Sequence, residues 1–202
     1  MNFLVFLFFC SLSWSQEKWL FLGDSLTEGY GISKDSSFPA LIENMWNEQH
    51  PDRKINVINA GVSGATSASG MSRLRWHTKE EVNLIFIALG ANDGLRGQSL
   101  SQMKKNLQEM IDYSLSKTDQ VYLAGMILPQ NYGTSFTKNF EAVFNELSKN
   151  NPKVFYMPFL LKDVAGKRDL NLSDGIHPNE AGYKVIANNV FKFIKERYDK
   201  IK

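Results

Sequence analysis

Val82-Asn-Leu-Ile-Phe-Ile-Ala-Leu89 is the stretch that decides the fold, because it is the longest continuous apolar run of the chain beyond its first residues. A strand that is apolar on both faces is typical of a parallel sheet that helices cover on both sides. The polar stretch at residues 90–97 ends the run, and a helical pattern of apolar residues follows at 100–115. The run therefore predicts a central parallel strand followed by a helical connection.

The same alternation of apolar runs and helical patterns extends in both directions from this strand. Further strands are predicted at residues 18–22, 55–60, 120–126 and 153–157. Further helices are predicted at residues 38–46, 136–147 and 183–194. Because parallel strands need crossover connections and helices stand between these strands, we predict one α/β domain over residues 16–202. Its expected architecture is a doubly wound five-stranded parallel sheet with helices on both faces, a flavodoxin-like three-layer sandwich.

The composition of the 202 residues fits one globular domain, since 43% of them are hydrophobic and 22% are charged. The net charge of +2 is small and the basic residues are spread along the chain, which argues against a nucleic-acid partner. Neither a Walker A motif nor a G-x-G-x-x-G motif occurs, so nucleotide binding is disfavoured. The chain also lacks the G-x-S-x-G motif of the α/β-hydrolases.

The first residues form an apolar segment that predicts a signal peptide at residues 1–15. The segment is too short to span a bilayer as a helix but long enough for a signal-peptide core. Ser13 and Ser15 are small residues at the two positions that a signal peptidase reads before a cut at Gln16. The predicted location is periplasmic or secreted, with no stable membrane span; because no basic residue precedes the cut, an uncleaved anchor stays an alternative. Cys10, the only cysteine, lies in this segment, so the processed chain has no disulfide.

Four polar stretches that contain glycine directly follow predicted strands. They lie at residues 23–31, 61–70, 90–97 and 128–133. In doubly wound sheets the loops at the carboxyl ends of the strands form the ligand crevice, so we expect these stretches to meet there. The stretch at 61–70 is rich in Gly, Ser and Thr and is predicted to be a flexible loop outside the core.

Ser25 lies directly after the first predicted strand, at the rim of the sheet. A serine hydroxyl is a weak nucleophile and needs a histidine base that a carboxylate holds in place. His50 at a helix end and His77 among charged residues are typical of solvent-exposed side chains, whereas His177 lies in a turn with Asp174 three residues upstream. These residues form a candidate nucleophile, base and carboxylate. Taken singly, the serine is as typical of a helix N-cap, and the Asp-x-x-His turn as typical of a cap before a helix.

Acyl transfer also needs hydrogen-bond donors aimed at the oxyanion, and backbone N–H groups of glycine loops or an asparagine amide can supply them. Gly64 lies in the second of the polar stretches and Asn92 in the third. Each alone is typical of a turn or a helix cap. The position of all four polar stretches after predicted strands favours a functional site.

Four short motifs resemble the four blocks of the SGNH, or GDSL, hydrolase superfamily, in the same order. They are Gly23-Asp-Ser-Leu26, Gly64 after Asn59-Ala60, Gly90-Ala-Asn-Asp93 and Asp174-Gly-Ile-His-Pro178. The resemblance extends from about residue 19 to the last helix. Residues 89–97 and 128–133 in particular resemble the bacterial periplasmic thioesterases that also act as arylesterases and lysophospholipases.

The resemblance implies a serine esterase that cleaves esters or thioesters through an acyl-enzyme, without a metal or an organic cofactor. The catalytic residues that it implies are Ser25, Asp174 and His177. The oxyanion donors that it implies are the N–H groups of Ser25 and Gly64 and the side chain of Asn92. Gly61, three residues before Gly64 in the same block, is an alternative donor.

The expected substrates are small acyl esters, acyl thioesters or lysophospholipids. Apolar residues on or near the crevice loops favour an acyl chain: Met71, Leu95, Met126, Ile127 and Leu128. The predicted substrate-binding residues are Asp24, Leu95, Leu128 and Pro129. Because the fold and the triad do not determine the acyl group, a carbohydrate O-acetylesterase is an alternative. A non-catalytic module that binds a glycan or a lipid is a second alternative, and the sequence predicts no oligomeric state.

Overall fold

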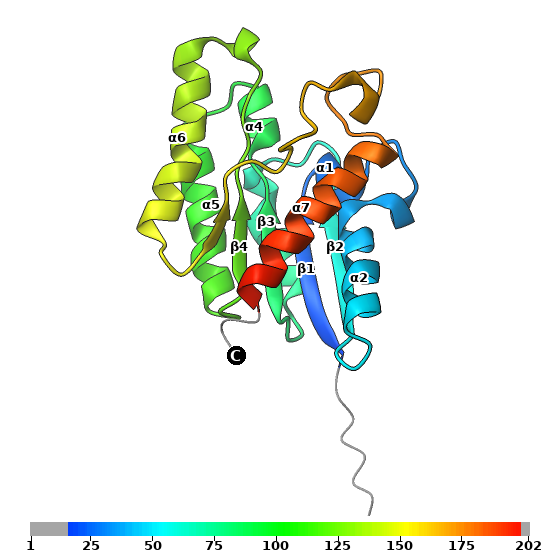
Figure 1. Ribbon diagram of the computed structural model, residues 1–202. Coiled ribbons are helices and arrows are strands. Elements are labelled where there is room, and N and C mark those ends of the chain that lie inside the picture. Colours follow the sequence, from blue (N-terminus) through cyan, green and yellow to red (C-terminus); the bar gives the residue numbers. More distant parts are fainter. Residues whose placement is uncertain (1–15, 199–202) are drawn as a thin grey trace, which may run out of the picture.

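A five-stranded parallel sheet with the strand order β2-β1-β3-β4-β5 forms the middle layer of the computed structural model (Figure 1). The strands are β1 (Glu17–Gly23), β2 (Ile55–Gly61), β3 (Leu84–Ala88), β4 (Val121–Ala124) and β5 (Phe155–Met157). This is the flavodoxin-like order, and the predicted fold class is confirmed. The structure describes residues 16–198, so the predicted signal peptide at 1–15 lies outside the described residues.

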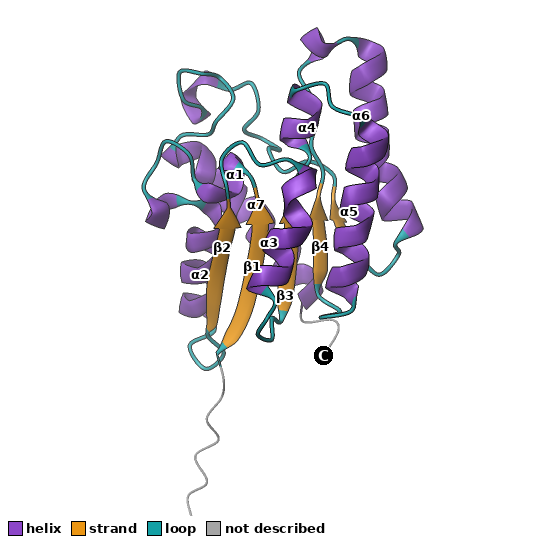
Figure 2. Ribbon diagram, turned by 180° about the vertical axis from the view of Figure 1, so that it is seen from behind, coloured by secondary structure: helices purple, strands orange, loops and turns teal. Residues whose placement is uncertain are grey.

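Helices cover both faces of the sheet. One face carries α2 (Phe38–Gln49) and α7 (Glu180–Tyr198), which pack against each other (Figure 1). The other face carries α3 (Gly70–His77), α5 (Leu100–Leu115) and α6 (Thr134–Asn150), which Figure 2 shows in front of the strands. Two short helices, α1 (Ser25–Glu28) and α4 (Ala91–Leu95), follow β1 and β3 at the carboxyl edge of the sheet. Among the described helices, none has the length and apolar character that crossing a membrane requires.

The central strand β3 is buried on both faces, as its apolar sequence predicts. The prediction places the ends of three strands too far out, since β3, β4 and β5 are each shorter than the apolar runs at 82–89, 120–126 and 153–157. Gly125, which follows β4, illustrates the reason. Its N–H donates to the Met157 carbonyl, but its own carbonyl accepts from Leu160 N–H, beyond the end of β5. The chain thus leaves the hydrogen-bonded ladder while the side chains that follow, such as Met126, stay buried. Apolar burial therefore extends beyond the hydrogen-bonded strands.

The stretch at 61–70 differs from its prediction, because part of it belongs to the core. Ala65 and Ser67 are buried, and the Ser67 N–H and hydroxyl donate to the two carboxylate oxygens of Asp93 at 2.8 and 2.5 Å. This charge-assisted pairing allows a polar loop to be buried. Helix α3, which the sequence analysis does not predict, then begins at Gly70, where a Cβ would lie 2.2 Å from the Met110 sulfur.

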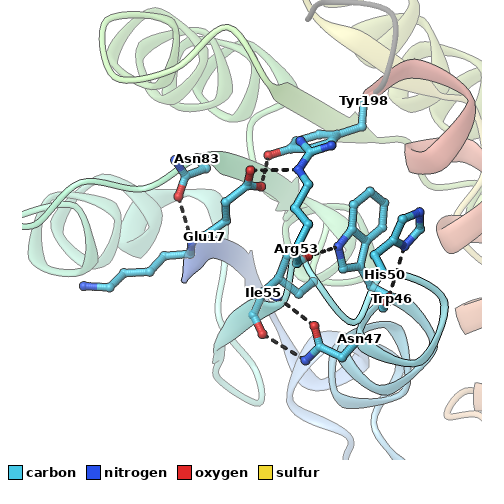
Figure 3. A network of polar contacts seen from close by, with 9 residues as sticks. Glu17, Trp46, Asn47, His50, Arg53, Ile55, Asn83 and Tyr198 are labelled. Atoms are coloured by element: carbon cyan, nitrogen blue, oxygen red, sulfur yellow. Dashed lines mark hydrogen bonds and ion pairs between the residues drawn. The ribbon is translucent and has the colours of Figure 1, made fainter. Parts of the chain in front are cut away.

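A cluster of polar contacts joins the last helix to the amino ends of the strands, at the edge opposite the crevice loops (Figure 3). The Tyr198 hydroxyl and the Arg53 guanidinium both reach the Glu17 carboxylate at the start of β1; the Arg53 Nε–Glu17 Oε1 distance is 3.1 Å. The guanidinium also lies over the rings of Trp46 and Tyr198, 5.7 and 4.9 Å from their centroids. These contacts connect α7, α2 and β1, so the helices on this face are positioned by both apolar packing and ion pairing.

Candidate active site

The ends of three adjacent strands bring the crevice loops together. Gly23 at the end of β1 pairs with Gly61 of β2 on one side and with Ala88 of β3 on the other. The segments that follow these residues therefore start side by side. This register brings Ser25, Gly64 and Asn92 toward the same part of the sheet edge.

A tight connection between β1 and α1 positions Ser25. A Cβ on Gly23 would lie 1.9 Å from the Thr27 hydroxyl oxygen, so the turn is too close for any other residue. Asp24 caps the helix, because its Oδ1 accepts a hydrogen bond from Leu26 N–H at 3.0 Å. Ser25 is the first residue of α1 and its exposed fraction is 8%. The backbone of Ser25 is thus firmly held, and little of the residue is open to solvent.

A short loop before α7 carries both His177 and Asp174. The loop is closed by an antiparallel bridge between Asn171 and Pro178 and by a hydrogen bond from Leu172 N–H to the His177 carbonyl at 2.7 Å. The Oδ1 of Asp174 accepts from the N–H groups of Ile176 and His177 at 2.9 and 3.0 Å. These hydrogen bonds, with that from His177 N–H foremost, lower the pKa of Asp174 to about 2, so the carboxylate is ionised at neutral pH.

The three predicted catalytic side chains form a continuous chain of contacts. The Oδ2 of Asp174 lies 2.7 Å from His177 Nδ1, and His177 Nε2 lies 3.0 Å from the Ser25 Oγ. Ser25 and His177 are 152 residues apart in the sequence. The buried Tyr183 of α7 holds the same turn, since its hydroxyl donates to the Ser25 carbonyl at 3.3 Å. The arrangement suits proton transfer from the serine to the imidazole.

Two backbone N–H groups near Ser25 are free to donate. No hydrogen bond within residues 16–198 uses the N–H of Ser25 or of Gly64, which has a φ of +75°. The N–H of Gly61 is engaged, because it donates to the Asn59 side-chain oxygen at 3.0 Å. Of the two glycines that the sequence leaves open, Gly64 is the one with a donor available in this structure.

The amide of Asn92 bridges the loops that follow three strands. Its Nδ2 donates to the Ala65 carbonyl at 3.0 Å and contacts the Asp24 Oδ2 at 3.4 Å. The first contact is a good hydrogen bond, while the second is at the limit of hydrogen-bond length. Asn92 therefore ties α4 to the loop after β2 and to the N-cap of α1.

Asp24 is a buried carboxyl group beneath the site, with an exposed fraction of 2%. Burial raises its pKa to about 6, while hydrogen bonding and the charges of His177 and Arg73 oppose that rise. Arg73 reaches the same region from α3, where its Nη1 donates to the Gly23 and Ala60 carbonyls at 2.9 and 2.8 Å. Of the other predicted substrate-binding residues, Leu128 is buried, Leu95 is half-buried and Pro129 is exposed.

The other histidines do not contact this site and are half-buried rather than exposed. The ring of His50 stacks on Trp46 with a centroid distance of 4.1 Å, at the opposite edge of the sheet. His77 ends α3. Within residues 16–198, no group of three or more His, Cys, Asp and Glu side chains is arranged to hold a metal ion.

Three side chains around the site have no signal in the sequence analysis. Tyr30 places its ring 4.5 Å from that of His177, measured between centroids. Glu28 accepts hydrogen bonds from the N–H and the hydroxyl of Ser63, which holds the loop before Gly64. Arg96 places a guanidinium nitrogen next to Gly64. Each of these contacts joins two segments that are distant in the sequence. Such contacts leave no periodic pattern from which they could be predicted.

Residues 21–185 match the model of the GDSL-like lipase/acylhydrolase family. The chain belongs to this family. It is therefore an ester-bond hydrolase, and the resemblance found in its motifs is confirmed. The match to the family covers the segments that form the candidate site, from the last residues of β1 to the first turns of α7.

Curated relatives and a solved structure place the chain within the family. It is 35% identical over 187 residues to an arylesterase of Vibrio mimicus, with 91% of this chain and 92% of the relative covered. It is 34% identical over 170 residues to thioesterase 1/protease 1/lysophospholipase L1 of Escherichia coli, with 84% and 79% covered. The crystal structure of the psychrotrophic esterase EstA from Pseudoalteromonas sp., inhibited by monoethylphosphonate, is similar with a TM-score of 0.82 and 30% identity over 91% of this chain and 100% of that one.

Proposed function

We propose that this chain hydrolyses carboxylic esters and thioesters of acyl chains, with Ser25 as the nucleophile, His177 as the general base and Asp174 as the carboxylate that orients the base. The observation that carries the proposal is the continuous set of contacts from Asp174 through His177 to Ser25 Oγ, at 2.7 and 3.0 Å. Both distances are within the range that proton transfer requires. The ionised Asp174 favours the imidazole tautomer whose Nε2 accepts the serine proton.

The reaction proceeds in two half-reactions. The Ser25 oxygen attacks the carbonyl carbon while His177 Nε2 takes the hydroxyl proton, and the tetrahedral intermediate collapses as His177 returns the proton to the departing alcohol or thiol. Water then attacks the acyl-enzyme with His177 again as the base, which releases the acid and restores the Ser25 hydroxyl. The products are one carboxylic acid and one alcohol or thiol per water consumed.

The oxyanion donors that we propose are the N–H groups of Ser25 and Gly64 and the Asn92 amide. The two N–H groups have no acceptor within the described residues, so they are available without rearrangement. The Asn92 amide keeps its 3.0 Å hydrogen bond to the Ala65 carbonyl and exchanges the longer contact with Asp24 for the oxyanion. Donors aimed at the developing charge are among the largest contributions to catalysis.

An acyl group with a hydrocarbon chain fits the surroundings of the site. Within residues 16–198, six large apolar side chains are exposed, and five of them lie on segments at the carboxyl edge of the sheet: Tyr30, Val62, Ile127, Tyr132 and Ile176. Only Trp76, on α3, lies elsewhere. Exposed apolar side chains gathered at one edge are typical of a surface that contacts an apolar ligand. The names of the arylesterase and of the thioesterase/lysophospholipase relatives support the same substrate class.

We also propose that residues 1–15 are a signal peptide and that the protein is periplasmic or secreted. The support is the short apolar segment of the sequence, with small residues Ser13 and Ser15 before Gln16. N-terminal sequencing of the protein recovered from culture medium or periplasm tests this: a mature chain that starts at Gln16 is expected. Recovery only from the membrane fraction with an intact Met1 would contradict it.

The experiment that tests the activity measures kcat/KM across p-nitrophenyl esters from acetyl to palmitoyl, with Ser25→Ala as the blank. We expect rates that rise with acyl length and vanish in the variant. A second measurement treats the protein with an ethylphosphonate ester and follows its mass; the adduct should form on the wild type and be absent from Ser25→Ala. Activity confined to acetyl esters would favour a carbohydrate O-acetylesterase. A protein that neither reacts nor hydrolyses any ester would be a binding module.

A further inference from the structure

Arg96 lies beside the proposed oxyanion donors. It follows α4 directly, four residues after Asn92, and its N–H donates to the Asn92 carbonyl at 3.2 Å. Its Nη2 lies 3.1 Å from the position that a Cβ on Gly64 would occupy. The guanidinium therefore lies against the backbone of the glycine whose N–H is a proposed donor.

The Arg96 guanidinium has no partner among the described residues. Its side chain is exposed and makes no hydrogen bond or ion pair with any group in residues 16–198. Carboxylates on the neighbouring loops are engaged by other donors: Glu28 by Ser63, Asp93 by Ser67 and Asp24 by Leu26. A cation that the protein leaves unpaired next to its reactive centre is available to a charged substrate.

The backbone that carries Arg96 is well anchored. Asp93 in the middle of α4 is buried and receives two hydrogen bonds from Ser67. The Gln98 N–H donates to the Asp93 carbonyl at 2.9 Å, which closes the turn on the other side of Arg96. The side chain thus starts from a fixed point, and fewer conformations are lost when it binds an anion.

We propose that Arg96 binds a phosphate group on the alcohol part of the substrate, a few bonds from the scissile ester. This inference rests on the proposed esterase function and narrows its substrate class to phosphorylated glycerol esters of the lysophospholipid kind. The planar guanidinium matches the geometry of a phosphate and can donate two parallel hydrogen bonds to it. The anion belongs to the alcohol part because exposed apolar side chains at the same edge of the sheet suit the acyl part.

The test compares two soluble substrates that share an acyl chain and a scissile bond: 1-hexanoylglycerol and 1-hexanoylglycerol 3-phosphate. Steady-state kcat and KM are measured for the wild type, Arg96→Gln, Arg96→Lys and the control Arg75→Gln. Arg75 is an exposed arginine on α3 whose guanidinium lies over the Tyr113 ring, so its variant removes the same charge elsewhere. We expect Arg96→Gln to lower kcat/KM for the phosphate ester about tenfold more than for the neutral ester, through KM. Arg96→Lys should retain part of the preference for the phosphate ester over the neutral ester. Arg75→Gln should retain all of this preference.

An Arg96→Gln enzyme with an unchanged ratio of the two kcat/KM values, or one that loses both activities equally, would overturn the proposal. A second measurement does not need turnover: glycerol 3-phosphate is titrated into the wild type and Arg96→Gln, and the NMR shift of the Gly64 amide is followed in both proteins. Shifts in the wild type alone are expected, and equal shifts or none in both proteins would overturn the proposal. A wild type that cleaves neither ester would contradict the proposed function, and the titration then still decides the role of Arg96.

Discussion

The phenol ring of Tyr30 lies against the imidazole ring of His177, with 4.5 Å between centroids and 41° between the ring planes. Tyr30 belongs to the same turn as Ser25, because its N–H donates to the Ser25 carbonyl at 3.1 Å. About half of the tyrosine is exposed to solvent. One turn of the chain thus carries both the proposed nucleophile and the aromatic ring that packs against the proposed base.

Replacing Tyr30 by alanine should lower kcat/KM for p-nitrophenyl esters about two- to fivefold. The reason is that the ring restrains the imidazole and its face stabilises the imidazolium that forms during the reaction, a contribution of about 0.5–1 kcal/mol at an exposed site. Tyr30→Phe keeps the ring and should keep the activity. If Tyr30→Phe were as slow as Tyr30→Ala, the hydroxyl rather than the ring would be the important group.

Asp24 should make the free energy of unfolding depend on pH. Burial raises its pKa from 3.8 to about 6, so the folded protein binds a proton that the unfolded chain releases between these two values. The stabilisation from this proton is complete below pH about 4 and is lost as the pH rises through about 6, a change of about 3 kcal/mol. The asparagine in Asp24→Asn does not titrate, so this variant does not lose stability in that way.

Urea unfolding of the wild type and Asp24→Asn between pH 4 and 7 measures the effect. The stability of the variant relative to the wild type should increase by about 2–3 kcal/mol across this range. Titrating groups that do not interact with Asp24 contribute equally to both proteins and cancel in the difference. Parallel stability curves would show that Asp24 titrates normally.

Asn92 should affect kcat far more than stability. Asn92→Ala removes one of the proposed oxyanion donors, and we expect a loss of about 10²–10³ in kcat. Asn92→Asp has nearly the same shape but no donor, so it should be at least as slow. Circular dichroism and urea unfolding verify that both variants fold. A rate close to that of the wild type in Asn92→Ala would remove Asn92 from the oxyanion site.

Asp93 should be important for stability although it does not contact Ser25. Its carboxylate accepts both donors of the buried Ser67, whose hydroxyl in turn accepts from Asn106 Nδ2 at 2.9 Å. Asp93→Asn places an amide donor against one of these groups and should lower the free energy of unfolding by about 2–3 kcal/mol. The control Glu109→Gln, on the exposed side of α5, should change it by less than about 0.5 kcal/mol. Equal effects of the two changes would contradict this role.

The sequence allowed the sheet and the longer helices to be predicted because apolar periodicity records burial directly. The strand at Leu84–Ala88 and the helix at Leu100–Leu115 are examples. Helix α3 could not be predicted in this way. It begins with glycine and Leu74 is its only buried apolar side chain, so its helical pattern is too weak. The sequence predicts a loop outside the core for the stretch before it, since nothing near Ser67 in the sequence reveals its partner Asp93.

One part of the candidate site could be predicted from the sequence. It consists of the residues whose type and position along the chain the chemistry requires. Ser25, Asn92 and His177 belong to that group. The positions of Tyr30 and Arg96 could not be predicted from the sequence, because their contacts depend on how separate loops meet at the edge of the sheet. The choice between Gly61 and Gly64 needed the hydrogen bond that occupies the Gly61 N–H.

The loop between Asn171 and Pro178 holds the proposed base and its proposed carboxylate partner in one short, self-closed segment. A displacement of this loop would alter the distance from His177 to Ser25 while leaving the distance from His177 to Asp174 unchanged. The contact of the imidazole with Ser25 therefore depends on how this loop lies against α1, whereas its contact with Asp174 depends on the loop alone. One short peptide segment thus supplies both His177 and Asp174, and the rest of the chain supplies only the surface on which it lies.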